Sequence, residues 1–418
     1  MAKQFRFNVS IYLDTRRKKE NGKYPAKLKV YCKKSKKKKL YNIDRDFSKE
    51  EFEHIWENGN LSKLRKKNRE ALKFLNELIE RAEDVAKNME PFTLEKFEKK
   101  FFRKSTDGNN LIYHYNKAIE KHKKEGKIGS ANGLLYSLKS IQKFIEHKES
   151  KKLNIIPFDK ITDDFLNQYE RFMYEKGKSV STVGIYLRDL RRVFNWAINE
   201  EDISRDIYPF GKDLYQISKG KKVKKALNDA KLNVLFNSVV KTSQQQKAKD
   251  FWFFSFCCNG MNIKDIALLK HSDLESDKFS YYRAKTFSKN KVKEKIIIYF
   301  NDYIIDFIDK YKVVNNEQFI FDIINSKDDE ESRYKKIKNF TRFINQHFKK
   351  LAKNNGIDDD VSSYWARHSF ATKVIRDGNS MEFVSQALNH SDVKVTQSYF
   401  DGFEDETIKE YSKKLMNF

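Results

Sequence analysis

Apolar and polar residues alternate with the two-residue period of β-strands along residues 4–48. The three alternating segments read QFRFNVSIYLD, AKLKVYCKK and LYNIDRDFS, and the breaks between them contain Asn21-Gly22 and a KSKKKK run. Because successive side chains of a strand point to opposite faces, this pattern predicts a three-stranded antiparallel sheet. Ser48 and Glu51 have capping-box spacing, which predicts a short helix after the last strand.

The apolar period changes to that of helices from residue 61 onward. Residues 61–89 predict one connecting helix that ends near Glu90-Pro91, because the residue before a proline avoids helical backbone. Further apolar stripes, separated by glycines, predict a bundle of helices in residues 92–215. The expected helices of this bundle are 93–102, 111–124, 130–147, 162–176 and 181–199.

A mostly helical region with one small β-sheet is predicted for residues 227–418. The FWFFSFCC segment is apolar on every face, so the helix that contains it, 244–258, should lie in the centre of a core. Two strands with a lysine-rich turn between them are expected at 281–285 and 294–299. The other expected helices are 229–240, 302–312, 334–353 and 405–418.

Taken together, these patterns predict a mainly α, multidomain protein with a small N-terminal sheet. The expected parts are a sheet with its connecting helix, a helical bundle, a short basic linker and a mostly α region with a small sheet. In that order, they are expected to span residues 1–90, 91–215, 216–226 and 227–418.

The chain is strongly basic, with 85 Lys and Arg residues against 59 Asp and Glu and a formal net charge of +26. This excess favours a polyanionic partner, and nucleic acid more than a membrane surface. No stretch approaches the roughly 18 apolar residues that a membrane span requires, and the N-terminus lacks a signal-peptide core. The three cysteines have no zinc-ligand spacing, so we expect buried free thiols, a reducing cytoplasm and no metal.

Several basic clusters are candidates for contacts with DNA. Lys36 and Lys37 belong to the lysine run between two predicted strands. Two more candidates, Lys221 and Lys222, lie in the linker. In helix 181–199, three arginines lie away from the apolar stripe: Arg188, Arg191 and Arg192. The alternative for the lysine run and for the arginine helix is an ordinary solvated surface.

Residues 361–400 hold the side chains that best suit phosphoryl chemistry. Tyr364, Arg367 and His368 lie close together in the sequence, and His390 and Tyr399 follow them. A guanidinium presents a planar donor fork to phosphate oxygens, and an imidazole can donate or accept a proton. A tyrosine hydroxyl beside them could attack phosphorus covalently. The alternative from spacing alone is a buried polar cluster with a core tyrosine.

This stretch resembles a known family. ARHSFAT and VSQALNHSDVKVTQSYF are similar to the last two signature boxes of the tyrosine recombinases, the phage integrase family. The resemblance implies that Tyr399 is the nucleophile, that Arg367 grips the nonbridging oxygens and that His390 braces the phosphate or assists proton transfer. For His368 we expect a buried, hydrogen-bonded role in the fold. Tyr364 stands where the family usually has histidine, and its phenol can hydrogen-bond a phosphoryl oxygen.

The segment NGMNIKDIALLK resembles the first box of the family, but Asn262 occupies the position of its arginine. One cation expected at the phosphate is therefore missing, and Arg283 and Lys264 are candidates to replace it. Arg283 lies two residues before Lys285, so a strand would point both to one face. Lys285 is similar to the lysine that protonates the leaving 5′ oxygen in the family. Alternatives on the same turn are Lys289, Lys291 and Lys293.

The resemblance extends to domain roles and partners. It implies an arm-type DNA-binding domain, a core-binding domain and a catalytic domain, which together act on double-stranded DNA as a homotetramer with accessory DNA-bending proteins. It implies a 3′-phosphotyrosyl intermediate, resolved by a 5′ hydroxyl from a second duplex, with no ATP, metal or other cofactor. It also implies docking of the C-terminal helix on a neighbouring subunit and a cytoplasmic, nucleoid-associated location in bacteria.

Three functions follow as hypotheses. The first is a site-specific recombinase, the integrase of a mobile element, acting in integration and excision or in inversion. The second is a nicking topoisomerase of the eukaryotic type, which shares the chemistry but fits the three-part layout less well. The third is a catalytically impaired, sequence-specific DNA-binding protein, which the departures at Asn262 and Tyr364 make credible.

Overall fold

The computed structural model describes residues 6–60, 62–102, 107–220, 225–287, 293–313, 318–390, 392–400, 402–403 and 405–414. The chain divides into two compact units, and each is formed from separate stretches of sequence. One unit comprises Met1–His114, Lys151–Leu166 and Arg191–Leu214. The other comprises Tyr115–Ser150, Asn167–Leu190 and Tyr215–Phe418.

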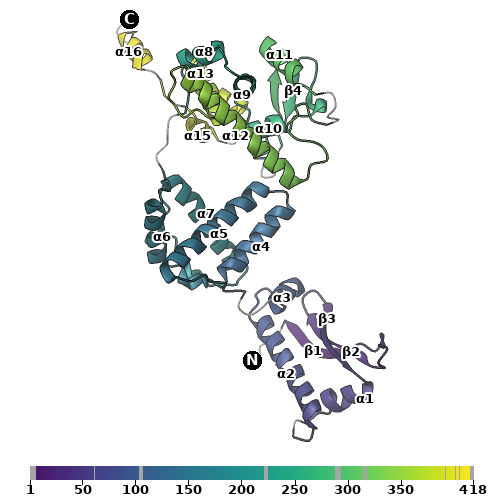
Figure 1. Ribbon diagram of the computed structural model, residues 1–418. Coiled ribbons are helices and arrows are strands. Elements are labelled where there is room, and N and C mark those ends of the chain that lie inside the picture. The colour runs from purple at the N-terminus through teal and green to yellow at the C-terminus, as the bar shows by residue number, and fades with distance from the viewer. Residues whose placement is uncertain are drawn as a thin grey trace. The chain divides into compact units, whose positions relative to one another are not determined.

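The first unit begins with a three-stranded antiparallel sheet, as the alternation of apolar residues predicted (Figure 1). Its strands, in spatial order, are β1 (Phe7–Leu13), β2 (Tyr24–Cys32) and β3 (Lys37–Phe47). Ile11 pairs with Leu28, and Leu28 pairs with Tyr41 in the next strand. All three are buried, so one face of the sheet belongs to the core.

Helices cover that face of the sheet. The predicted capping box is present at Ser48 and Glu51, and it opens α1 (Lys49–Phe52), which continues as one π-helical turn, η1 (Glu53–Glu57). The connecting helix α2 (Lys66–Lys87) and α3 (Leu94–Phe101) bury their apolar stripes in the same core as the strands. The helices pack on the sheet because this contact removes the apolar surface of both from water.

The helices predicted at 111–124, 130–147, 162–176 and 181–199 are present, but the one predicted at 93–102 is α3, which packs in the core of the sheet because its buried side chains are Phe97 and Phe101. The bundle contains α4 (Leu111–Lys124), α5 (Ile128–Glu149), α6 (Asp163–Glu175) and α7 (Val180–Asn199), with short 3₁₀ turns η2 (Phe158–Lys160) and η3 (Arg205–Ile207). Ser137 of α5 connects its neighbours, because its hydroxyl hydrogen-bonds the Tyr115 phenol of α4 and donates to the Tyr186 carbonyl of α7. Both contacts lie within the second unit.

The C-terminal part of the second unit is built around α9 (Ser243–Cys257). As predicted, the aromatic run of α9 is buried, and Trp252 stacks on Phe348 of α12 (Glu330–Asn354) with 4.7 Å between ring centroids. The Trp252 Nε1–H also donates to the Ser362 carbonyl, just before α13 (Ser363–Arg376). The core therefore places the start of α13. The remaining helices here are α8 (Asp229–Asn237), α10 (Ile263–Ala267), α11 (Asp302–Tyr311), α14 (Met381–Ala387), α15 (Val393–Gln397) and α16 (Asp405–Lys414), with the 3₁₀ turn η4 (His271–Asp273).

One predicted strand has the wrong bounds. The small antiparallel sheet consists of β4 (Lys278–Tyr281) and β5 (Ile296–Tyr299), so β4 ends before Arg283 and Lys285 instead of containing them. The main chain leaves the sheet because its N–H groups find other acceptors. The Ala284 N–H donates to the Asp265 carboxylate, and those of Thr286 and Phe287 donate to the Arg283 carbonyl. Alternation along a strand therefore cannot place Arg283 and Lys285 on one face.

Two smaller expectations can be compared with the structure. Cys32 and Cys258 are buried, Cys257 is partly buried, and all three are free thiols. Among the described residues, no helix combines the length and the apolar character needed to cross a membrane.

Candidate active site

The first turns of α13 hold three of the predicted side chains on neighbouring positions. The N-terminus of this helix is fixed from α12, because the Asn345 side chain accepts a hydrogen bond from the Ser363 N–H at 2.7 Å. Positions three and four residues apart lie on the same face of a helix. Tyr364, Arg367 and His368 therefore project toward one region.

Arg367 is buried, with 2% of its surface exposed. Its Nη1 donates to the Gly260 carbonyl at 3.2 Å, and its Nη2 donates to the Leu388 carbonyl at 2.6 Å. Burial, and then the nearby Arg283 guanidinium, lower the pKa of Arg367, although a guanidinium stays charged at neutral pH. Gly260 packs directly on this residue, since a Cβ there would lie 2.5 Å from the Arg367 Cα.

His390 lies beside Arg367 and holds a defined tautomer. The Arg367 Nη2 and the His390 Nε2 are 3.1 Å apart, and because a guanidinium can only donate, Nε2 accepts. The proton therefore resides on Nδ1, which donates to the Thr396 hydroxyl at 2.9 Å. Burial, with the charges of Arg367, Arg283 and Lys285, lowers the pKa of His390 to about 3. The ring is neutral at physiological pH.

Tyr399 follows α15 and lies in the same group, with 7% of its surface exposed. Its ring centroid is 5.0 Å from that of His390, and the Arg367 Cζ is 5.6 Å from the Tyr399 ring centroid. The main chain of Tyr399 is also held, because its carbonyl accepts from His368 Nδ1 and from the Thr372 hydroxyl, each at 3.3 Å. Arg367, His390 and Tyr399 thus meet within one chain.

The phenol of Tyr364 hydrogen-bonds the phenol of Tyr399, with 2.7 Å between the two oxygens. Burial, and then this hydrogen bond, raise the pKa of Tyr364. Burial also opposes ionisation of Tyr399, but the hydrogen bond from Tyr364 and the charges of Arg367, Arg283 and Lys285 outweigh it and lower the pKa of Tyr399. The phenol nearest the cations is therefore the one that ionises more easily.

Arg283, in the turn after β4, lies close to Arg367, because both side chains bond one carbonyl. It is 6% exposed, and its Nη1 donates to the Leu388 carbonyl at 3.4 Å, the carbonyl that Arg367 also uses. The turn is tied to α10, since the Ala284 N–H donates to the Asp265 carboxylate at 2.9 Å. Burial raises the pKa of Asp265, whereas this hydrogen bond and the two guanidinium groups oppose the rise.

The Nε–H group of each buried guanidinium is unmatched among the described residues. Within the described part of the chain, neither the Arg283 Nε nor the Arg367 Nε has a hydrogen-bond partner, although both atoms are buried. Buried polar groups are normally hydrogen-bonded, and leaving a charged donor unmatched is costly. The two arginines share the Leu388 carbonyl as an acceptor, and guanidinium groups that lie this close suit an anionic ligand with several acceptor oxygens.

The other first-box candidates, Asn262 and Lys264, lie at the start of α10. Asn262 is partly exposed and precedes α10, where its carbonyl accepts from the Asp265 and Ile266 N–H groups. Its side chain makes no capping hydrogen bond. Lys264 is exposed on α10. Of the two proposed replacement cations, Arg283 is the one with a hydrogen bond to an acceptor that it shares with Arg367.

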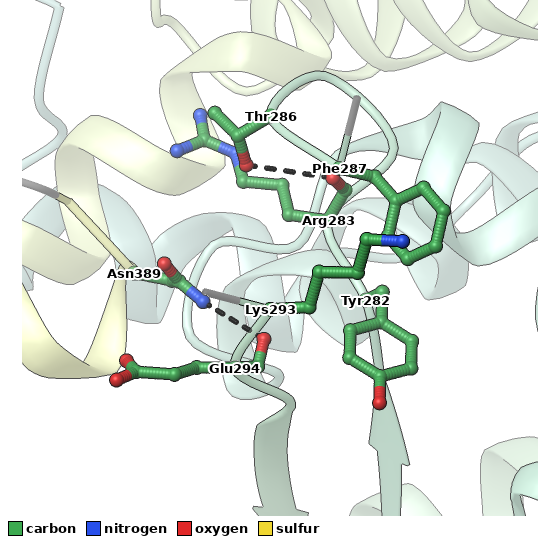
Figure 2. A pocket seen from close by; sticks show the side chains of 7 residues that line it. All are labelled: Tyr282, Arg283, Thr286, Phe287, Lys293, Glu294 and Asn389. Carbon is green, nitrogen blue, oxygen red and sulfur yellow. Dashed lines mark hydrogen bonds between the residues drawn. The ribbon is translucent and has the colours of Figure 1, made fainter. Parts of the chain in front are cut away.

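Lys285 is exposed on the turn that follows Arg283, and its charge contributes to lowering the pKa values of His390 and Tyr399. Figure 2 shows part of this turn, in which Arg283, Thr286 and Phe287 line a pocket together with Asn389. Of the alternative lysines, Lys293 lies with its Nζ 4.2 Å from the centroid of the Phe287 ring. The other two, Lys289 and Lys291, lie outside the described residues.

The predicted DNA contacts lie on exposed surface where the structure describes them. Lys36 and Lys37 are exposed in and after the turn between β2 and β3. On α7 all three arginines are exposed: Arg188, Arg191 and Arg192. The linker candidates Lys221 and Lys222 lie outside the described residues.

Sequence reasoning did not identify several groups that shape the site. The Leu388 carbonyl has no residue-type signal, because any residue supplies one. Thr372 and Thr396 are ordinary helix residues in sequence, yet they bond Tyr399 and His390. Asn389 offered a signal, since asparagine tolerates left-handed backbone, and its φ is +49°.

One group of possible metal ligands occurs among the described residues. It lies earlier in the sequence than Arg283 and the signature residues 361–400. His114, Glu200 and Asp202 have ligand atoms within 4.8 Å of one another. His114 Nε2 is 3.1 Å from the Gly108 carbonyl and 3.5 Å from Asp202 Oδ2. These contacts describe a buried hydrogen-bonded histidine, and we assign no metal to it.

Two family models match the chain. One describes a phage integrase SAM-like domain and matches residues 110–217, and the other describes the phage integrase family and matches residues 225–406. Among curated proteins, a tyrosine recombinase XerC of Pediococcus pentosaceus is 23% identical over 63% of this chain and 84% of its own. A XerD of Listeria innocua is 23% identical over 65% of this chain and 88% of its own.

A solved structure shares the fold. The Tn1549 transposon integrase, in complex with transposon right end DNA, superposes with a TM-score of 0.50 and 16% sequence identity. The match covers 73% of this chain and 99% of that one.

Proposed function

Because this chain belongs to the tyrosine recombinases of the phage integrase family, we propose that it cleaves and rejoins double-stranded DNA through a covalent bond to Tyr399. Site-specific recombination is the activity of the family. The observation that carries the assignment of residues is the meeting of Tyr399, Arg367 and His390 within a single protomer.

The covalent step exchanges one phosphoester for another. The Tyr399 oxygen forms a bond to phosphorus, the bond from phosphorus to the 5′ oxygen breaks, and a 3′-phosphotyrosyl link results. The phenol releases its proton to solvent water, and the leaving 5′ oxygen gains a proton from Lys285 acting as general acid. A 5′ hydroxyl from another duplex then attacks the same phosphorus and releases Tyr399. The number of phosphoester bonds is unchanged, so the reaction needs no external energy source.

Two guanidinium groups stabilise the charge that develops on the phosphoryl oxygens. We assign Arg367 the role that its signature position implies, and we assign Arg283 the role of the missing first-box arginine. Their support is the shared Leu388 carbonyl together with the unused Nε donors. Such preorganised donors act strongly because the protein holds them in place before the charge forms. Asn262 can add a neutral hydrogen bond at the rim.

The rings of His390 and Tyr364 lie beside the nucleophile and have different roles. His390 is neutral and fixes the orientation of Arg367 through Nε2, so it braces the phosphate through the guanidinium. Tyr364 bonds the nucleophile in the absence of DNA, and it becomes available to a phosphoryl oxygen once Tyr399 turns to phosphorus. His368 holds the main chain of Tyr399 and serves the fold.

We assign DNA binding to the parts of the chain that precede the catalytic domain. We assign the sheet and its connecting helix, predicted as residues 1–90, to an arm-type DNA-binding domain with Lys36 and Lys37 at its rim, and we include α3 because it packs in the same core. The helices that follow, up to residue 215, are assigned to a core-binding domain. In the core-binding domain, the exposed arginines of α7 contact DNA: Arg188, Arg191 and Arg192. Linker lysines Lys221 and Lys222 neutralise phosphates between this domain and the catalytic domain, 227–418.

The biological role that fits best is integration and excision, or inversion, of a mobile element. The support is the fold shared with a transposon integrase whose complex contains transposon DNA, together with the N-terminal sheet module. The working assembly is a tetramer on DNA, with accessory DNA-bending proteins as further partners and the bacterial cytoplasm as the location.

Trapping on a nicked suicide substrate tests the proposal. Substrates are designed from repeats in the DNA that flanks the gene, so that the cleaved 5′ end diffuses away and the covalent complex accumulates. Wild-type protein is expected to form a protein–DNA adduct that survives denaturation, and Tyr399→Phe is expected to form none. Tyr411→Phe, which removes the same hydroxyl from a tyrosine of α16, is the matched control and should behave like wild type.

The same experiment separates the alternatives. Specific binding of the substrate without any adduct would leave only a DNA-binding protein of this fold. An adduct that relaxes supercoiled plasmid without exchanging partners would indicate a nicking topoisomerase.

A further inference from the structure

One three-residue turn, Leu388-Asn389-His390, contacts the buried charged groups of the site. The Leu388 carbonyl accepts from both Arg283 and Arg367, and the His390 ring accepts from Arg367. The remaining member of the turn, Asn389, has a separate contact that the chemistry above does not use.

Asn389 connects this turn to the small sheet. Its side-chain Nδ2 donates to the Glu294 carbonyl at 3.2 Å, across 95 positions of sequence. Glu294 lies two residues before β5 begins, on the return path of the segment that carries Lys285. Figure 2 shows the Asn389 amide directed at the main chain of Glu294, and both residues line a pocket together with Arg283.

The backbone conformation of Asn389 directs its side chain toward the Glu294 carbonyl. Its φ of +49° is left-handed, a conformation that only glycine, asparagine and aspartate adopt readily. Glycine would satisfy the backbone equally well but could make no side-chain hydrogen bond. The contact with Glu294 is therefore a property of asparagine at this position and is separable from the turn itself.

In the described parts of the segment between β4 and β5, residues 282–287 and 293–295, few hydrogen bonds reach other elements. The two strands are four residues each, and a two-stranded sheet is marginal by itself. One end of the segment is held by Asp265 through the Ala284 N–H and by the Leu388 carbonyl through Arg283. Asn389 supplies a hold at the other end. Lys285 is exposed between these two points, so its long side chain depends on the backbone of the segment for its position.

We infer that Asn389 is a positioning residue that holds the Lys285 segment against the Arg367–His390 cluster, so that the general acid reaches the leaving 5′ oxygen. The inference rests on the proposed function. It predicts a defect confined to the protonation of the leaving group, because the hydrogen bond of the Asn389 side chain goes to Glu294, in the segment that carries Lys285.

A change of leaving group tests this. In a suicide substrate whose scissile 5′ oxygen is replaced by sulfur, the leaving thiolate needs no proton, since a thiol is far more acidic than an alcohol. We expect Asn389→Gly to slow adduct formation about 10- to 100-fold on the oxygen substrate, the range that a small misplacement of a catalytic group produces. On the sulfur substrate its rate should return to within about 2-fold of wild type.

A double-mutant cycle adds a second readout. If Asn389 acts through Lys285, the pair Asn389→Gly with Lys285→Ala should be no slower on the oxygen substrate than Lys285→Ala alone. Asn389→Asp keeps the backbone preference and loses the donor, so it should be at least as slow as Asn389→Gly. The matched control is Asn379→Gly, which removes an amide that donates to the Val374 carbonyl at the far end of α13. This control should leave both rates unchanged.

Three outcomes would overturn the inference. They are a wild-type rate for Asn389→Gly on the oxygen substrate, an equal loss on both substrates, and additive losses in the cycle. DNA binding and the thermal midpoint of Asn389→Gly are measured alongside, so that a loss caused by unfolding is recognised as an equal loss on both substrates. Failure of wild type to form any adduct would instead reject the proposed function.

Discussion

The phenol oxygens of Tyr364 and Tyr399 lie 2.7 Å apart, so the proposed nucleophile is hydrogen-bonded to the residue that replaces the usual histidine of the family. Because Tyr399 lies among cations, it is the better candidate for the acceptor when the pair loses a proton. Tyr364 then acts as the donor that stabilises the phenolate. This contact relates the departure at position 364 directly to the chemistry of Tyr399.

Removal of the Tyr364 hydroxyl should move the pH dependence of cleavage. The pKa of Tyr399 is lowered against burial by the Tyr364 hydrogen bond and then by Arg367, Arg283 and Lys285. In Tyr364→Phe the hydrogen bond is absent, so the pKa should rise, and the rate should fall at neutral pH and recover at alkaline pH. The measurement is the rate of adduct formation across that pH range.

The other ionisable rings that face Tyr399, His390 and His368, stay in place in this variant and have pKa values lowered by burial, so both are neutral throughout the range. Tyr364→His is the control, because it restores a hydrogen-bonding side chain. A loss of rate that is equal at every pH would show that Tyr364 binds phosphate only.

Loss of Arg283 should slow cleavage strongly while DNA binding persists. Removal of one preorganised donor from a developing oxyanion costs about 100- to 1,000-fold in rate, so Arg283→Ala should fall by that factor on the suicide substrate. Lys264→Ala tests the other candidate cation and should remain near wild type, since Lys264 is exposed on α10. Unchanged cleavage by Arg283→Ala would reject it as the substitute.

Gly260 should tolerate no side chain. Its φ is +62°, and a Cβ would lie 2.5 Å from the Arg367 Cα, a backbone atom that cannot move independently of α13. Gly260→Ala should therefore destabilise the catalytic region by about 1–3 kcal/mol and displace Arg367. Denaturant unfolding and the rate of adduct formation measure the two effects.

Gly356→Ala provides the comparison for Gly260. Its φ is +74°, but nothing lies within 4 Å of an added Cβ, so only the backbone strain applies. We expect a cost of about 1 kcal/mol and a normal cleavage rate. Equal effects of the two substitutions would show that the packing of Gly260 on Arg367 is unimportant.

Acid should destabilise the fold partly through His390. Its pKa is about 3 in the folded protein, below its ordinary value of 6.5, so the unfolded state binds more protons in that interval. The stability that depends on neutral His390 is thus complete above pH 6.5 and is lost as the pH falls toward 3. His390→Gln should show a shallower decline, measured as the urea midpoint against pH. A decline identical to wild type would contradict this.

The arginines of α7 should contribute to binding by neutralising DNA phosphates. Replacing Arg188, Arg191 and Arg192 with alanine should weaken binding to the core site and reduce the slope of log affinity against log salt by about 0.9 for each phosphate that is no longer neutralised. The measurement is a salt titration of affinity. A lower affinity with an unchanged slope would indicate base readout or a folding defect instead.

Local pattern in the chain determined most of the elements and the identity of the reactive side chains. The alternation in residues 4–48 and the all-round apolar run of α9 specify local structure, because a strand or helix buries whichever face its own residues make apolar. Arg367, His390 and Tyr399 lie in a stretch whose residue types and spacing already indicate their chemistry.

Only the tertiary structure decided which groups complete the site. The Leu388 carbonyl accepts hydrogen bonds from two guanidinium groups, and the Asn389 side chain donates to a carbonyl 95 positions away in sequence. Neither interaction has a signal in sequence, because a main-chain acceptor is the same in every residue. The end of β4 was mispredicted for a related reason. The acceptor that draws Ala284 out of the strand is the side chain of Asp265, 19 positions earlier, and only folding brings the two together.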